Sequence, residues 1–238
     1  MKRKQMFLKS GVALLLFCAA LSLLWMNGRK SLFKQTAVAD ARLADAPCVV
    51  LDAGHGGIDP GKVGVNGALE KDLNLEIMLL VKKYLEADDI RVVVTRDSDT
   101  GLYDAGASNK KVQDMKRRIA LIEETAPVVT VSIHQNSYPE EYVHGAQVFY
   151  YTGSEEGRKL AERIQERLVA KVDPDNKRPV KANDSYYLLK KTSSTIVIVE
   201  CGFLSNYEEA EKLCTREYQE MLAWEIHLGI IQYLNETD

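Results

Sequence analysis

The fold of this chain can be predicted from one stretch near residue 50, Val49-Val50-Leu51-Asp52-Ala53-Gly54-His55-Gly56-Gly57. An apolar run that ends in several glycines is typical of a short buried strand followed by a tight turn. The same change from apolar strand to polar turn recurs at Val131-Ser132-Ile133-His134-Gln135-Asn136-Ser137. Each of these two predicted strands therefore leads directly to a histidine.

Segments typical of strands and of helices alternate along the rest of the chain. Apolar runs predict strands over Cys48–Leu51, Arg91–Thr95, Val128–Ile133, Gln147–Tyr151 and Thr195–Val199. Apolar residues at helical spacing predict helices over Leu73–Leu85, Lys116–Glu124, Glu155–Val172, Tyr207–Cys214 and Glu217–Tyr233. Polar composition predicts surface loops over Asp97–Asp114 and Asp173–Tyr186. This alternation predicts an α/β domain with a mainly parallel sheet.

The composition is that of an ordinary globular protein, but the charge is unevenly distributed. The chain has 238 residues, of which 46% are hydrophobic and 27% are charged. Residues 1–44 hold eight of the 31 basic residues and one of the 34 acidic ones, so residues 45–238 carry a net charge of −10. Such a domain lacks the excess of Lys and Arg that neutralises phosphates, and nucleic acid is not an expected partner. Its size suits one well-buried domain.

The N-terminal segment has the pattern of an export signal. Basic residues precede sixteen uncharged, mostly apolar residues, Gly11–Met26, and positive charge resumes at Arg29-Lys30. This apolar run is long for a signal-peptide core and just shorter than the roughly 18–20 residues that span a bilayer. Residues 1–27 are therefore predicted to be a signal peptide or a membrane anchor, residues 28–45 a linker, and residues 46–238 a folded domain outside the cytoplasmic membrane.

Cysteine usage leaves little room for disulfides. Cys18 lies in the apolar N-terminal run, and only Cys48, Cys201 and Cys214 remain for the domain. Three cysteines form at most one disulfide, and the sequence does not choose the pair. Each of the three is interpreted as a small buried hydrophobic residue, so stability is expected to come mainly from the core.

Four residues at the ends of predicted elements can carry chemistry. His55 and His134 follow strands, and ligands bind at the carboxyl ends of strands in α/β sheets. Glu70 stands at the start of a predicted helix, and Glu200 directly follows the apolar run Ile196–Val199. A carboxylate in that last position is costly to bury unless it is paired or functional.

Together these four residues predict a catalytic zinc site. Such sites have three protein ligands and keep a fourth position open, and imidazole favours zinc over magnesium or calcium. His55, Glu70 and His134 are the predicted metal ligands, and Glu200 is the predicted proton-transfer group. Each imidazole is expected to be oriented through its other nitrogen, and Asp52 is a candidate for this role. Taken singly, residues of these types are more often structural, so the prediction depends on their convergence.

At these residues the chain resembles the zinc-dependent N-acetylmuramoyl-L-alanine amidases. The family's motifs are matched, in the family's order, by Asp52–Gly57, Glu70, Ser132–Asn136 and Glu200–Asn206. The resemblance covers nearly all of residues 47–234. It implies His55, Glu70 and His134 as zinc ligands, Glu200 as the catalytic acid/base, and a single domain with a twisted sheet of about six strands flanked by helices.

Further positions agree with the family or depart from it. Arg96 and Arg118 fall where the family carries arginine, whereas Ile122, Glu123 and Thr195 replace its usual Ala, Asn and Pro. None of the departures is a predicted ligand. The segment between the second histidine motif and the last motif has no room for a long helical insertion. A single domain behind a short export segment most resembles the germination-specific, spore-cortex amidases.

The resemblance implies an enzyme that hydrolyses the amide between N-acetylmuramic acid and L-alanine of peptidoglycan. It also implies a role in spore cortex maturation, with muramic lactam formation, and in germination, on the envelope or forespore side of the membrane. Peptidoglycan is the implied partner, without assigned contact residues, and the need for a protein activator stays open. Two alternatives remain at this point: a zinc peptidase that acts within the stem peptide, and a peptidoglycan-binding protein without turnover.

Overall fold

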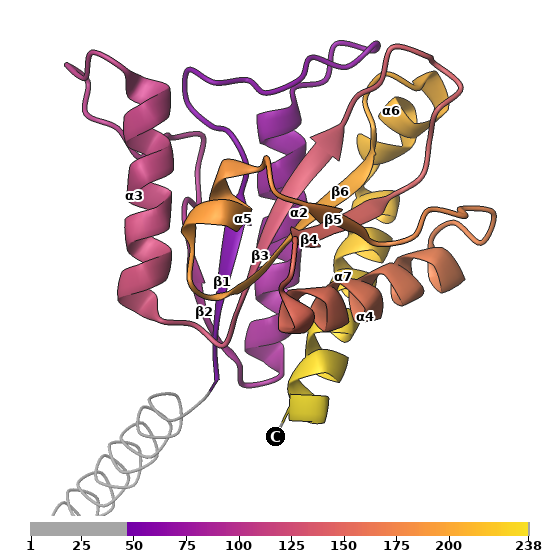
Figure 1. Ribbon diagram of the computed structural model, residues 1–238. Helices are drawn as coiled ribbons and strands as arrows, with labels where there is room; N and C mark the ends of the chain where they lie inside the picture. Colours follow the sequence, from indigo (N-terminus) through magenta and orange to yellow (C-terminus); the bar gives the residue numbers. More distant parts are fainter. Residues whose placement is uncertain (1–46, 238) are drawn as a thin grey trace, which may run out of the picture. The chain divides into compact units, whose positions relative to one another are not determined.

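A six-stranded sheet forms the centre of the computed structural model, which describes residues 47–237 (Figure 1). The predicted export segment and linker lie outside the described residues. The strands are β1 (Cys48–Ala53), β2 (Arg91–Val94), β3 (Val129–Asn136), β4 (Gln147–Tyr151), β5 (Lys181–Asn183) and β6 (Thr195–Phe203). Their order is β2-β1-β3-β6-β4-β5, and only the β4–β6 pair is antiparallel. The predicted mainly parallel sheet of about six strands is confirmed.

Helices cover both faces of this sheet (Figure 1). One face is covered by α2 (Glu70–Ala87), α4 (Glu155–Lys171) and α7 (Arg216–Thr237). The other face is covered by α3 (Lys110–Thr125) and the short α5 (Tyr187–Lys191), while α6 (Tyr207–Leu213) packs against β6 and α7. Within residues 47–237, no helix combines the length and apolar character needed to cross a membrane.

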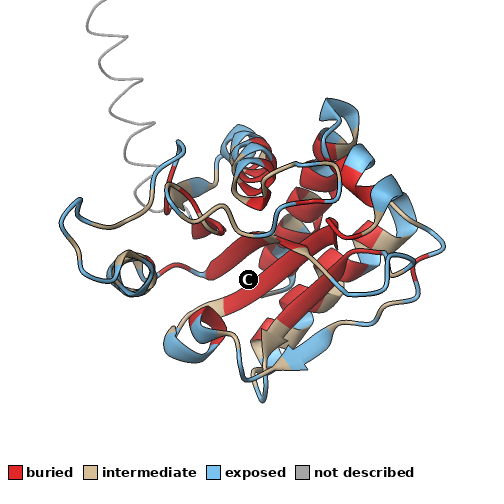
Figure 2. Cartoon of the chain, turned by 90° about the horizontal axis from the view of Figure 1, so that it is seen from above, coloured by how far each residue is buried: buried red, intermediate tan, exposed pale blue. Residues whose placement is uncertain are grey.

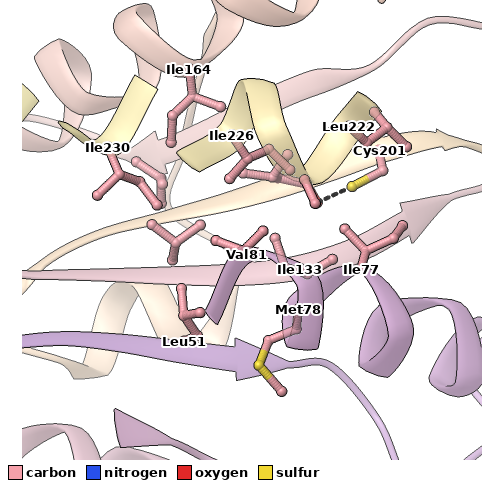
Figure 3. Packing of buried hydrophobic residues seen from close by; sticks show 14 of the residues in the cluster. Leu51, Ile77, Met78, Val81, Ile133, Ile164, Cys201, Leu222, Ile226 and Ile230 are labelled. Carbon is pink, nitrogen blue, oxygen red and sulfur yellow. Dashed lines mark hydrogen bonds between the residues drawn. The ribbon is translucent and has the colours of Figure 1, made fainter. Parts of the chain in front are cut away.

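Burial is concentrated in the strands and on the inner faces of the helices (Figure 2). The larger hydrophobic core lies between the sheet and α2, α4 and α7 (Figure 3). Its labelled members in that view are Leu51, Ile77, Met78, Val81, Ile133, Ile164, Cys201, Leu222, Ile226 and Ile230. A smaller core lies under α3 and α5 and includes Val50, Ile122, Phe149, Leu188, Leu189, Ile196 and Ile198.

The two-residue period of the strands decides which side chains reach the α3/α5 face. Ile133 and Val199 belong to the larger core, so the next residues, His134 and Glu200, point to the opposite face. These two residues are partners in the β3–β6 register. Asp52, which follows a core residue of β1, lies on the same face. Polar groups thus gather at the carboxyl edge of the sheet, above the smaller core.

Two elements are absent from the sequence-based prediction. The predicted loop over Asp173–Tyr186 contains β5 and leads into α5. β5 is a short and largely exposed edge strand, and α5 has five residues, so neither displays a periodic apolar pattern. In addition, α3 begins at Lys110, six residues before its predicted start, because the Asn109 side chain caps it by accepting from Val112 N at 3.1 Å.

All three cysteines of the described domain are free thiols. Cys48 and Cys201 are buried, as predicted, whereas Cys214 is exposed at the end of α6, where the prediction was wrong. Stability of residues 47–237 therefore comes from the two hydrophobic cores and from buried polar contacts rather than from disulfides.

Candidate active site

The glycine-rich turn after β1 has an unusual backbone. His55 has φ 64°, in the left-handed region that costs a side-chain-bearing residue energy, and Gly56 and Gly57 follow with φ 127° and 57°. Such strain persists only where surrounding contacts hold it. The imidazole Nδ1 lies 3.0 Å from Asp59 Oδ2, four residues along the chain, and this contact turns Nε2 of His55 toward α2.

Two buried arginines hold the same turn through its carbonyl groups. Arg118 donates to Ala53 O at 2.7 Å and to His55 O at 2.6 Å. Arg96 donates to Ala53 O at 3.0 Å and to Gly54 O at 3.1 Å. The arginines that match the family pattern therefore act on the backbone that presents His55, a role that their spacing in the sequence does not reveal.

The three predicted ligands meet at one point. Glu70 Oε1 lies 3.2 Å from His55 Nε2 and 3.0 Å from His134 Nδ1, and all three ligand atoms lie within 4.8 Å of one another. The two rings meet edge to face, with 5.1 Å between centroids. A Cβ atom on Gly54 would lie 2.2 Å from His134 Cε1, so only glycine allows this approach.

Glu70 is ionised in this environment although it is only 4% exposed. Burial by itself would raise the pKa of its carboxyl group, but His134 and His55 hold that pKa well below its usual range. Lys62 N donates to Oε2 at 2.7 Å, and Gln135 N donates to Oε1 at 3.1 Å. Two imidazole nitrogens and an ionised carboxylate are a suitable donor group for a zinc ion.

Glu200 lies close to this cluster but is not part of it. It is 7% exposed, and burial raises the pKa of its carboxyl group despite the opposing effect of His134. Oε1 accepts a hydrogen bond from Tyr186 Oη at 3.3 Å, whereas the buried Oε2 has no hydrogen-bond partner within residues 47–237. A buried carboxyl group with a raised pKa and one free oxygen is suited to proton transfer.

The cluster of proposed ligands, through His55 and His134, and Glu200 line one cavity of about 290 Å³. It lies between α3, α5 and the carboxyl ends of β1, β3 and β6. His55, His134 and Glu200 line its polar part, and Ile58, Met115, Leu188 and Ile198 line its apolar part. Of the four predicted site residues, three form the cluster and the fourth faces the same cavity.

The predicted role of Asp52 is wrong. Its carboxylate accepts from Arg118 Nη1 at 2.6 Å, Thr95 Oγ1 at 2.7 Å and Ser132 Oγ at 2.6 Å, and it forms no hydrogen bond with an imidazole. Burial alone would raise the pKa of Asp52, but Arg118 and the hydroxyl donors lower it to about 2. The carboxylate that orients His55 is that of Asp59, which comes four residues after the histidine in the same turn.

A mainly parallel α/β sheet brings two imidazoles and a carboxylate together beside a cavity that a second carboxylate also lines, and this set of groups suits a metal-assisted hydrolase. The comparisons with known proteins specify the class further. The model of the N-acetylmuramoyl-L-alanine amidase family matches residues 49–232. The chain belongs to this family, and it is a hydrolase that acts on peptidoglycan.

Individual relatives agree with this assignment. The germination-specific N-acetylmuramoyl-L-alanine amidase of Bacillus subtilis strain 168 is 37% identical over 191 residues, which cover 79% of this chain and 80% of the relative. The structure of the CwlD amidase of Clostridioides difficile, in complex with the GerS lipoprotein, is 38% identical with a TM-score of 0.78, over 80% of this chain and 99% of that chain. The structure of an N-acetylmuramoyl-L-alanine amidase from Clostridium difficile 630 is 32% identical with a TM-score of 0.72, and the match covers 82% of this chain and 100% of that chain.

Proposed function

We propose that His55, Glu70 and His134 hold a zinc ion, and that Glu200 is the catalytic acid/base in the hydrolysis of the N-acetylmuramoyl-L-alanine amide. The observation that carries the proposal is the meeting of the three donor atoms within 4.8 Å beside Glu200, which lines the same cavity as His55 and His134. When bound, zinc lowers the pKa of water toward neutrality and polarises a carbonyl group.

The residues of the chain supply the proton transfers. The carboxylate of Glu200 accepts the proton of the attacking water, and the carboxyl group then delivers it to the nitrogen of L-alanine as the C–N bond breaks. Burial raises the pKa of Glu200, and a carboxylate with a raised pKa is a stronger base for the first step. Asp59 keeps Nε2 of His55 directed at Glu70 and hence at the proposed zinc position.

We further infer that the enzyme acts on spore cortex, where removal of stem peptides prepares muramic acid for lactam formation and later germination. The similarity to a germination-specific amidase supports this role. Such a substrate requires export, for which residues 1–27 serve as signal peptide or anchor, while residues 46–238 carry the activity. The relative in complex with a lipoprotein supports a protein partner for this chain as well.

Digestion of purified cortex peptidoglycan, followed by mass spectrometry of the released fragments, tests the bond and the metal together. We expect free stem peptides with N-terminal alanine, and their loss when a chelator is added and return when zinc is restored. Release of a terminal stem residue instead would identify a peptidase. Activity that persists fully in the metal-free protein would exclude the zinc site.

The role of Glu200 is tested by Glu200→Gln, which keeps the size of the side chain but removes its basicity. We expect zinc content to be unchanged and turnover to fall by about 10²- to 10⁴-fold. The matched control is Glu208→Gln on the exposed surface of α6, whose carboxylate pairs with Lys212 at the surface. Full turnover by the Glu200 variant would overturn the assigned role.

A further inference from the structure

We propose that Tyr186 is a positioning residue for the reaction: its hydroxyl group binds Oε1 of Glu200 and fixes the orientation of this carboxylate in the wall of the cavity. The inference rests on the function proposed above for Glu200. It concerns a segment, β5 to α5, to which the sequence assigns no function. Within residues 47–237, Tyr186 is the only hydrogen-bond donor to this carboxylate.

The tyrosine is itself held in place before any substrate binds. Asn183 Oδ1 accepts from Ser185 N and Tyr186 N, both at 2.8 Å, and from Ser185 Oγ at 3.0 Å. These bonds form a tight turn that places Tyr186 directly before α5. On its other side, the ring of Tyr186 meets the ring of Phe149 edge-on, with 5.4 Å between centroids. Backbone and ring therefore both restrict the position of the hydroxyl group.

The contact with Glu200 then fixes one of its two oxygens. Oε1 accepts from Tyr186 Oη at 3.3 Å, and Oε2 is buried and has no hydrogen-bond partner within residues 47–237. Tyr186 and Glu200 both line the cavity that His55 and His134 also line. Without the hydroxyl group, the carboxylate of Glu200 could rotate about its last bond. Since proton transfer requires the accepting oxygen within hydrogen-bond reach of the water, such rotation lowers the fraction of productive encounters.

Tyr186→Phe tests this role, because it removes the hydroxyl group and keeps the ring against Phe149. On soluble glycan fragments that carry stem peptides, we expect kcat to fall about tenfold, with KM, zinc content and melting temperature unchanged. The matched control is Tyr151→Phe: Tyr151 packs against the same smaller core but does not line the cavity, and its variant should keep wild-type kcat. A kcat of Tyr186→Phe within twofold of wild type would overturn the proposal.

A double-mutant cycle with Glu200→Gln distinguishes positioning from direct contact with substrate. If Tyr186 acts through Glu200, adding Tyr186→Phe to Glu200→Gln causes no further loss of the residual activity. An additional tenfold loss in that background, or a rise in KM with kcat unchanged, means that the hydroxyl group binds substrate, and the proposal fails. Failure of the proposed amidase function gives a different result from failure of the Tyr186 proposal, since the wild-type protein would then release no stem peptides at all.

Discussion

Replacement of Arg118 by methionine tests the buried ion pair beneath the candidate site. The guanidinium group is 2% exposed and bonds to Asp52 Oδ1, Asp114 Oδ2 and the carbonyl oxygens of Ala53 and His55. Arg118→Met leaves the charge of Asp52 buried without its cation and the two carbonyl groups without this donor. Breaking a buried pair in this way costs about 3–5 kcal/mol of unfolding free energy, so we expect Arg118→Met to be among the more destabilising substitutions in the domain.

The pH dependence of this loss follows from the pKa of Asp52. That pKa is lowered from 3.8 to about 2, which contributes about 2 kcal/mol to stability at neutral pH. Because the folded-state pKa is the lower one, this contribution is complete above about pH 4 and is lost as the pH falls through 2. The difference in stability between wild type and Arg118→Met should therefore be largest at neutral pH and shrink below pH 4.

Urea denaturation followed by circular dichroism measures the effect, with Arg117→Met as the matched control. Arg117 is the preceding residue of α3, and it pairs with Asp104 on the surface at 2.7 Å. Exposed pairs contribute at most about 1 kcal/mol. The double variant Asp52→Asn with Arg118→Met should be less destabilised than Arg118→Met alone, since the buried charge of Asp52 is removed together with its cation. Equal stability of the Arg117 and Arg118 variants at pH 7 would refute this reasoning.

Two further predictions concern the proposed zinc site. Asp59→Asn removes the charged partner of His55 Nδ1 and should weaken zinc binding about 10- to 100-fold; competition with a chromophoric chelator measures the affinity, and a wild-type value would contradict the assigned role. Gly54→Ala should abolish stable zinc retention because its Cβ would lie 2.2 Å from His134 Cε1. Gly106→Ala, where no atom lies within 4 Å, should keep wild-type zinc content. Elemental analysis measures the zinc content of both glycine variants. Equal zinc content in the two would disprove the predicted clash between a Cβ at position 54 and His134.

The sequence predicts the parts of this structure that depend on local periodicity. Strand ends can be located from apolar runs, and parallel strands bring their carboxyl ends to one edge, so the convergence of His55, Glu70 and His134 is predictable. The contacts made by Tyr186 cannot be predicted in this way. Tyr186 follows β5, and β5 forms through pairing with β4 and has no apolar alternation of its own.

The error about Asp52 has a similar origin. An acid at the start of a histidine motif suggests contact with the imidazole, but alternation along β1 places the carboxylate of Asp52 against the guanidinium group of Arg118 in α3. The choice between Asp52 and Asp59 depends on the left-handed backbone of the intervening turn. That backbone conformation is stabilised by tertiary contacts from distant residues, which a local pattern does not contain.

The pairing of His134 with Glu200 in the β3–β6 register has a consequence for how this enzyme can evolve. Neighbouring strands lie about 4.8 Å apart whatever connects them, so the backbone spacing of a proposed ligand and the proposed base is independent of the 65 residues between them. Insertions or deletions in the connection between β4 and β6 can therefore occur without changing this backbone spacing. The constraint on that connection is instead at Tyr186, whose hydroxyl group must still reach Glu200.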